Sequence, residues 1–173
     1  MANYQEILTK AVVGKGKKTC QDSYTLKSNL KPSKVLGCWV INHSMKPLLK
    51  EDKVYVDGEF EVHIWYAYDD DKNTELHKEK ITYSEHVPFK MKKNEELTTK
   101  QELKAYCTNY PSCTELKIKD EGLFLTIQKD FIVDAIGEAV IKVQLSDLVE
   151  EPLDIDEEID NNVDVNYLNK DNK

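Results

Sequence analysis

Strict alternation of side-chain type from Phe60 to Tyr68 constrains the fold more than any other feature of the sequence. Every second residue of this segment is aromatic or aliphatic, whereas the residues between them include Glu61 and His63. Successive side chains of a β-strand point to opposite faces, so a strand here would bury one face and expose parts of the other. The pattern therefore predicts a half-buried strand over these nine residues.

Further segments alternate in the same way and are rich in β-branched residues, which favour strands. They predict strands over Ile7–Val13, Lys18–Leu26, Val35–Asn42, Lys53–Val56, Thr74–Tyr83, Glu102–Thr108, Thr114–Lys119, Leu123–Val133 and Glu138–Leu145. Glycine, proline, asparagine and aspartate predict turns between them, at Gly14–Gly16, Lys31–Ser33, Asp57-Gly58, Asp69–Asn73, Tyr110–Ser112 and Asp120–Gly122.

Short strands separated by regular turns are typical of an antiparallel sandwich or barrel. We therefore expect an all-β fold, an antiparallel β-sandwich or open barrel. Asp57-Gly58 predicts a tight hairpin, because glycine tolerates positive φ. Two segments are candidates for short helices, Asn94–Leu103 and the residues after Ser146, although neither has an apolar stripe.

The negative charge of the chain is concentrated at its C-terminal end. Residues 147–173 contain ten acidic residues and two lysines, and they carry the whole formal net charge of -8. The first 146 residues are formally neutral. This predicts a β-sandwich domain over 1–146 and a flexible acidic tail over 147–173. The tail also contains aliphatic residues, which a purely solubilising segment does not need, so it is a candidate partner-binding segment. Its densest part is Asp154, Ile155, Asp156, Glu157, Glu158 and Ile159.

Charge and hydropathy narrow the classes of partner. A neutral body with an acidic tail argues against nucleic-acid binding, which needs a basic surface. The chain has no arginine, so bidentate guanidinium contacts to phosphate are excluded. The longest apolar stretch, Val35–Ile41, is far shorter than the roughly 20 residues of a membrane-spanning helix. The first ten residues do not resemble a secretory signal, so we expect a cytosolic protein.

Two segments resemble ligand-binding loops only in part. Gly14–Thr19 lacks the earlier glycine of a phosphate-binding loop and precedes a predicted strand instead of a helix. Asp69–Glu75 places oxygens at alternate positions, but Thr74 occupies the position of the required glycine and Lys80 that of the bidentate glutamate. The four histidines are scattered, and no serine or cysteine has a known nucleophile motif. We expect neither an enzyme nor a cofactor or metal site.

Aromatic residues concentrate on two predicted strands. Core packing accounts for many of them, but aromatics on both faces of one strand indicate that a second surface covers the strand. If that surface is another copy of the chain, the aromatics become interface anchors. The candidate self-assembly residues are Trp39, His63, Trp65, Tyr66 and Tyr68.

The four cysteines have no zinc-type or redox-motif spacing. One interpretation is that they are small, partly buried apolar residues. The other is that they form cross-links between copies in an oxidising environment. The candidates are Cys20, Cys38, Cys107 and Cys113.

Several blocks of the sequence together resemble the spore coat protein E (CotE) family of endospore-forming bacteria. They are Glu6–Lys17, Lys31–His43, Gly58–Tyr68, Pro111–Cys113 and Phe131–Glu138, followed by the acidic C-terminus. The resemblance implies a structural scaffold of the outer coat without catalytic residues or cofactors. It also implies assembly in the mother-cell cytoplasm into a layer around the forespore, and recruitment of coat proteins partly through the C-terminal region. The expected partners are further copies of the chain, other coat proteins and a coat-base ATPase.

A ligand-binding β-sandwich is the competing interpretation. Trp39, Trp65 and Tyr68 would then act as stacking surfaces for a ligand such as a carbohydrate. Stabilisation by a ligand without higher-order assembly would favour this class of protein.

Overall fold

Seven β-strands account for most of the described chain. The computed structural model describes residues 4–92, 96–120 and 122–144. The strands are β1 (Tyr4–Leu26), β2 (Pro32–Lys50), β3 (Lys53–Tyr68), β4 (Asn73–Val87), β5 (Phe89–Met91), β6 (Glu102–Lys119) and β7 (Gly122–Gln144). None of the described residues is helical, so the expected helix at Asn94–Leu103 is wrong over its described part. No membrane-spanning helix occurs in these ranges either.

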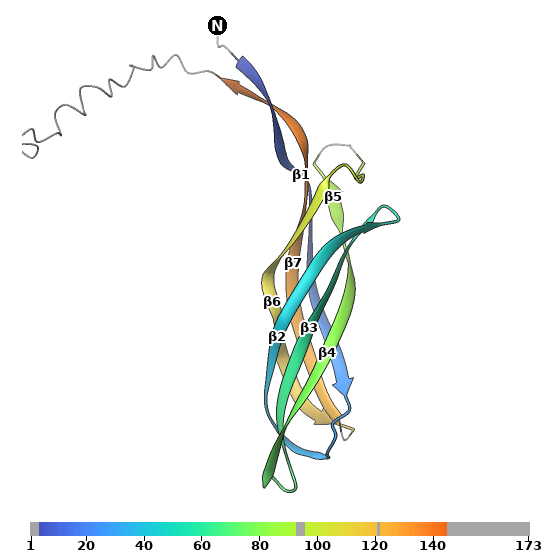
Figure 1. The fold of residues 1–173 in the computed structure, drawn as a ribbon, viewed down its shortest axis with the longest axis vertical. Coiled ribbons are helices and arrows are strands. Elements are labelled where there is room, and N and C mark those ends of the chain that lie inside the picture. The colour runs from blue at the N-terminus through green and yellow to red at the C-terminus, as the bar shows by residue number, and fades with distance from the viewer. Residues whose placement is uncertain (1–3, 93–95, 121, 145–173) are drawn as a thin grey trace, which may run out of the picture. The chain divides into compact units, whose positions relative to one another are not determined.

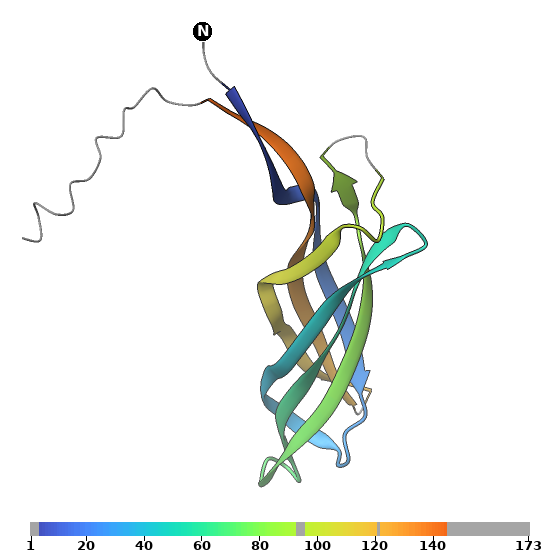
Figure 2. The same cartoon turned by 45° about the horizontal axis from the view of Figure 1, so that its top comes forward.

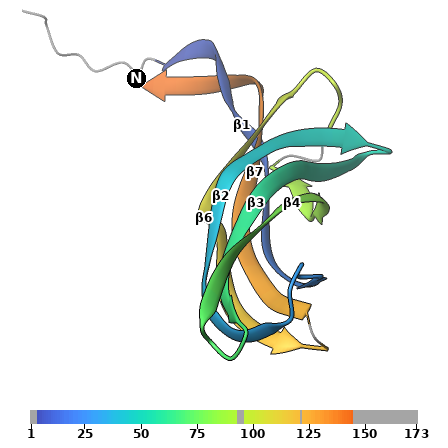
Figure 3. The ribbon, with the colours of Figure 1, turned by 60° about the horizontal axis from the view of Figure 1, so that its bottom comes forward.

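The strands form two antiparallel sheets, of order β5-β1-β7-β6 and β2-β3-β4. Figure 1 shows β2, β3 and β4 lying across the strands of the other sheet, and Figure 2 shows the same layers after a turn of the view. Seen more nearly along the strands, the sheets curve around a common interior without closing into a barrel (Figure 3). The expected all-β sandwich is therefore confirmed.

The chain divides into two units, Leu8–Ile141 and the terminal segments 1–7 and 142–173. Both sheets are built mainly from the first unit. In the described part of the second, Nζ of Lys142 lies 3.3 Å from Oε1 of Glu6, and both side chains are exposed. The expected acidic tail, 147–173, lies outside the described residues, so the boundary at residue 146 stays a prediction.

Three of the predicted turns lie inside continuous strands, and these expectations are wrong. One of them, at Asp57-Gly58, lies in β3 and has a separate cause. Gly14–Gly16 lies within β1, where it pairs with residues 89–91 of β5. Tyr110–Ser112 lies within β6, where the pairing with β7 shifts register instead of reversing direction. In both places strand pairing extends across a segment whose residue types permit a turn.

Gly58 explains why the predicted hairpin at Asp57-Gly58 does not form. It pairs with Met45 on one side and Tyr83 on the other, in the middle of β3. A Cβ atom at this position would lie 2.4 Å from Cζ of Tyr83. The tyrosine ring crosses the glycine backbone, and glycine is required for this close approach rather than for a turn.

The β2–β3 hairpin instead turns at Glu51-Asp52. The pair Lys50–Lys53 closes a two-residue loop, and Glu51 and Asp52 have φ values of 48° and 57°. Positive φ at both central residues is the signature of a type I′ turn, whose twist matches that of the strands. The predicted turn at Asp69–Asn73 is confirmed, with positive φ at Asp69, Asp70 and Asp71.

The buried face of β3 follows the predicted alternation, and the interior contains two apolar clusters. The first includes Phe60, Val62, Ile64 and Tyr66 of β3 together with β7 residues such as Leu125. The second is formed by Cys20, Val54, Val56, Val87, Phe131 and Val133. Burial of these side chains is the main stabilisation of the sandwich.

A charged residue separates the two apolar clusters along β7. Lys129 lies between Ile127 of the first cluster and Phe131 of the second, and its side chain is completely buried. It forms ion pairs with Asp22 of β1 and Glu85 of β4, and its Nζ lies 4.5 Å from the centre of the Tyr83 ring. Burial would lower the pKa of Lys129, but the hydrogen bonds and charges of the two carboxylates raise it. The lysine therefore remains charged in the interior.

Candidate assembly surface

The outer face of the β2–β3 pair brings together three of the predicted interface residues. Trp39 of β2 lies opposite His63 of β3, and Gly37 lies opposite Trp65. The neighbours of Trp39 and Trp65 along the strands, Cys38 and Ile64, face the core instead. Strand alternation therefore turns both indoles and the imidazole away from the interior.

The two tryptophans remain well exposed, with 54% of Trp39 and 39% of Trp65 accessible to solvent. Ile41 lies two residues from Trp39 on the same face and is 38% exposed. Leu36 is 51% exposed and occupies the register shift between Val35 and Gly37. We call these five residues, Leu36, Trp39, Ile41, His63 and Trp65, the aromatic patch. Clusters of exposed apolar side chains on a soluble domain mark interaction surfaces.

Sequence reasoning did not single out Leu36 and Ile41. The signal for Ile41 was present, because it continues the period of two from Trp39. No such signal existed for Leu36. The β-bulge adds a residue to β2 at this point and interrupts the alternation, so its exposure could not be read from spacing.

Gly37 gives the aromatic patch its flat centre. A Cβ atom at this position would lie 3.0 Å from Cη2 of Trp39, so the indole lies over the glycine backbone. The edge of the patch is polar. Nε2 of His63 lies 3.4 Å from Oε2 of Glu61, and Nζ of Lys80 lies 2.8 Å from Oε1 of Glu59. An apolar centre with a charged rim is the usual anatomy of a protein interface.

Two of the predicted interface residues face inward. Tyr66 is completely buried in the core, and its hydroxyl hydrogen-bonds to Glu75. Burial, followed by this hydrogen bond, raises the pKa of Tyr66. Tyr68 is partly buried and packs against the same core cluster. The surface available to a partner therefore excludes Tyr66, because it lies on the core face of β3 with Phe60 and Ile64.

The cysteines occupy different environments, and all four are free thiols. Cys20 is buried, and burial raises its pKa to about 11. Cys107 is partly buried on β6, with its Sγ 3.8 Å from Nδ1 of His43. Cys38 of β2 and Cys113 of β6 both pack at the margin of the first core cluster. Cross-links between copies stay a prediction.

The Cys107–His43 contact resembles a nucleophile with its base, and sequence reasoning missed it because the residues are 64 positions apart. Burial lowers the pKa of His43, and burial raises the pKa of Cys107. Both groups are therefore neutral at pH 7, whereas an activated cysteine needs a lowered pKa. Nε2 of His43 lies 2.6 Å from the Tyr83 hydroxyl. The arrangement is that of a packed polar cluster.

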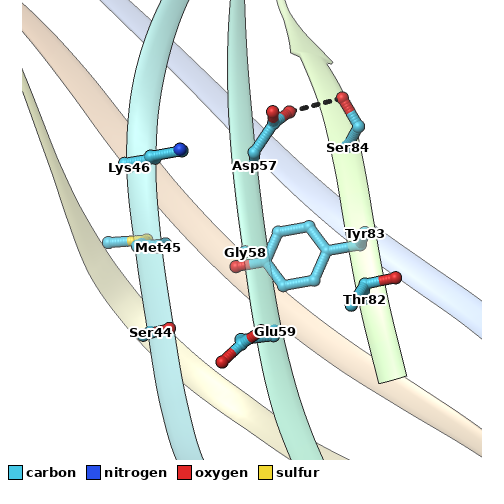
Figure 4. A pocket seen from close by; sticks show the side chains of 9 residues that line it. All are labelled: Ser44, Met45, Lys46, Asp57, Gly58, Glu59, Thr82, Tyr83 and Ser84. Carbon is cyan, nitrogen blue, oxygen red and sulfur yellow. Dashed lines mark hydrogen bonds between the residues drawn. The ribbon is translucent and has the colours of Figure 1, made fainter. Parts of the chain in front are cut away.

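A hollow of about 630 Å³ lies over Gly58 on the β2-β3-β4 sheet (Figure 4). Its lining includes Lys46, Glu59 and Asp57, and the carboxylate of Asp57 accepts a hydrogen bond of 2.6 Å from Ser84. This bond lowers the pKa of Asp57. No group of three His, Cys, Asp or Glu side chains suited to a metal ion occurs in the described part of the chain.

The predicted partner-binding residues Asp154–Ile159 lie outside the described residues. The candidate site is therefore the aromatic patch on the β2–β3 pair. Its exposed aromatic and aliphatic side chains can bind another molecule through stacking and apolar contacts.

Comparison with known proteins identifies the family. A family model described as outer spore coat protein E matches residues 3–172. No curated protein and no solved structure gives a match. The family match spans nearly the whole chain, in agreement with the resemblance of its sequence blocks, and the chain therefore belongs to the outer spore coat protein E family.

Proposed function

We propose that this protein is a structural scaffold that self-associates into a layer around the forespore and recruits other coat proteins. Membership of its family assigns it a role in the outer spore coat. Self-association, recruitment and assembly in the mother-cell cytoplasm are the parts that the proposal adds. A structural rather than catalytic role fits both the family and the chemistry of the aromatic patch.

The aromatic patch is the observation that carries the proposal. Tryptophan is enriched among the residues that dominate binding energy, and two of them lie together here on a rigid pair of strands. Residues 1–146 carry no net charge, so long-range repulsion does not oppose packing of copies at close range. We propose that the patch forms a contact between copies.

Recruitment is assigned to the acidic tail. Residues 147–173 carry the full net charge of -8, together with aliphatic residues such as Ile155 and Ile159. Acidic side chains accelerate encounter with basic partners, and aliphatic side chains supply contact area once bound. The proposed partners are other coat proteins and a coat-base ATPase.

The proposal is tested by light scattering behind size exclusion, with negative-stain imaging, under reducing conditions. The full chain and residues 1–146 are expected to form large or sheet-like assemblies. The W39S/W65S variant is expected to shift to monomers or small oligomers. Y110S is the matched control, because Tyr110 is 72% exposed but lies on β6, outside the patch. Unchanged melting temperatures would show that each variant is folded.

Three outcomes would contradict the proposal. Strictly monomeric behaviour of the full chain would show that the protein does not self-associate. Assembly of W39S/W65S to the same size as the unmodified chain would show that the aromatic patch does not form the contact between copies. Loss of assembly on deletion of 147–173 from a folded body would assign self-association to the tail instead.

Carbohydrate binding is the second candidate function, favoured by the same two exposed indoles. Trp39 and Trp65 lie on adjacent strands, so a sugar ring could stack on their faces. Thermal stabilisation by an oligosaccharide, lost in W39S/W65S and without higher-order assembly, would support this function over the scaffold.

A further inference from the structure

The two sheets meet along a seam between β2 and β6. β2 is the edge of the three-stranded sheet and β6 is the edge of the four-stranded sheet, and the two strands lie side by side. They belong to different sheets, so no ladder of backbone hydrogen bonds joins them. Any link across this seam must come from side chains.

Two cysteines face each other across the seam. Cys38 is on β2, opposite Ile64 of β3, and Cys113 is on β6, opposite Ile127 of β7. Both residues line the same hollow, and each shifts the pKa of the other. Both pack against the core cluster that contains Ile64 and Ile127, so the same apolar contacts hold the two thiols in place.

Solvent reaches this pair. Cys38 and Cys113 are only partly buried, and they line a hollow of about 250 Å³ together with Gly37, Thr114, Glu115 and Leu116. A small reagent can therefore approach the sulfur atoms from outside, unlike the sulfur of Cys20, whose residue is only 4% exposed.

The two thiols also differ in ionisation. The hydrogen bond from Cys38 lowers the pKa of Cys113 to about 7, against the opposing effect of burial. The same hydrogen bond, followed by burial, raises the pKa of Cys38. A thiolate is the nucleophile in disulfide exchange, and a pKa near the ambient pH is optimal for attack. Cys113 is therefore the attacking sulfur.

We propose that Cys38 and Cys113 form a redox-controlled disulfide that joins the two sheets within one chain. The oxidant is a low-molecular-weight disulfide such as oxidised glutathione. The Cys113 thiolate attacks one sulfur of the reagent, which forms a mixed disulfide and releases one thiolate. Cys38 then loses its proton to solvent and attacks Sγ of Cys113, which releases the second thiolate. The protein loses two protons and two electrons, and the reagent is reduced to two thiols.

The disulfide would link the two sheets on the β2–β6 side, as an ion pair already links them on the β1–β4 side. On the other side of the sandwich, Nζ of Lys18 on β1 lies 2.7 Å from Oε2 of Glu85 on β4, which links the two sheets. The β2–β6 side has the thiol pair in the corresponding role. A reducing cytosol would keep these thiols free, and an oxidising environment would close the bond. This inference does not depend on self-association.

The test uses the purified full chain, fully reduced and then incubated with oxidised glutathione at neutral pH. After alkylation of free thiols and denaturation, the intact mass should correspond to one chain with one disulfide and two alkylated cysteines. Peptide mapping should join Cys38 to Cys113. The bond closes a long loop of the unfolded chain, so oxidation should raise the melting temperature by about 10 °C.

Variants separate this pair from the other cysteines. C20S and C107S should form the bond and gain the same thermal shift as the unmodified chain. C38S should retain glutathione on Cys113 and gain no shift. The proposal is overturned if the unmodified chain forms only cross-links between copies, resists oxidation, or joins Cys38 or Cys113 to Cys20 or Cys107. The comparison of oxidised and reduced unmodified chain needs no variant to fold.

Discussion

Nζ of Lys129, on the central strand β7, lies 3.2 Å from Oε1 of Glu85, on the edge strand β4 of the opposite sheet. Lys129 also pairs with Asp22 of β1, so one buried ammonium group joins three strands. A buried charge is tolerated only when it is paired and hydrogen-bonded. This pairing holds the sheets together at the point where the two apolar clusters are divided.

Replacement of Lys129 by methionine should destabilise the protein. The variant leaves the carboxylate of Asp22, whose side chain is 37% exposed, without its partner, while Glu85 keeps Lys18. Loss of the hydrogen bonds that the charged Lys129 donates should cost about 1.5 to 3 kcal/mol. Urea denaturation should show a lower midpoint with an unchanged slope.

Lys80→Met is the matched control for this variant. Lys80 pairs with Glu59 at 2.8 Å, but both side chains are about half exposed. Exposed pairs contribute less than about 1 kcal/mol. Equal destabilisation of the two variants would contradict the role assigned to Lys129.

The free energy of unfolding should decrease in acid, because Glu85 has a lowered pKa in the folded protein. Burial would raise the pKa of Glu85, but the hydrogen bond from Lys18 and the charge of Lys129 lower it below its ordinary value of 4.5. A carboxyl group with a depressed folded pKa stabilises the fold above its unfolded pKa, and this contribution is lost as the pH falls through the folded pKa. The free energy of unfolding should therefore decrease below about pH 4.5. Glu85→Gln should flatten this part of the curve.

His43 should make stability depend on pH nearer to neutrality as well. Burial, together with the charge of Lys129, lowers the pKa of His43 below 6.5. The unfolded chain then binds a proton that the folded protein does not, so stability decreases as the pH falls below about 6.5. His43→Gln is expected to remove this slope, measured by chemical denaturation at a series of pH values. A slope that is the same in the variant would assign it to another group.

Gly58→Ala should destabilise the sheet without changing any polar group. The added methyl would lie 2.4 Å from Cζ of Tyr83, in a position closed on the other side by the backbone oxygen of Ser44 at 2.7 Å. Forcing extra volume into a packed site costs about 1 to 3 kcal/mol. Thermal melting measures the effect.

Gly37→Ala provides the comparison. Its new methyl meets the indole of Trp39 at 3.0 Å, and that side chain is exposed and free to move. A change within about 0.5 kcal/mol is expected, as for other surface substitutions. If G58A were as stable as G37A, the contact with Tyr83 would not be the reason for the glycine.

The turn at Glu51-Asp52 should accept a stabilising substitution. Both residues have positive φ, and Asn-Gly is the sequence preferred in such type I′ turns. E51N/D52G is expected to raise the free energy of unfolding by about 0.5 to 1 kcal/mol. Asp52→Ala should act in the opposite direction, because alanine disfavours positive φ. Opposite signs for these two variants, measured in urea, would verify the turn type.

The sequence alone determined the class of fold, the buried face of β3 and part of the aromatic patch. Each depends on the alternation of side chains with a period of two, which can be recognised within a short segment of the sequence. Alternation placed Trp65 on the face of this strand opposite to Phe60. The same reasoning misassigned Gly58, because glycine is suited both to a turn and to a strand crossed by a large side chain.

Only the tertiary structure decided which distant residues meet. Lys129 and Asp22 are 107 positions apart. The period of two places Lys129 on the buried face of β7 with Ile127 and Phe131, but it does not identify the partner of the lysine. Cys38 and Cys113 lie on the edges of different sheets, and their approach depends on how the sheets pack. Alternation fixes the face on which a side chain lies, but the order of strands and the packing of sheets fix what it touches.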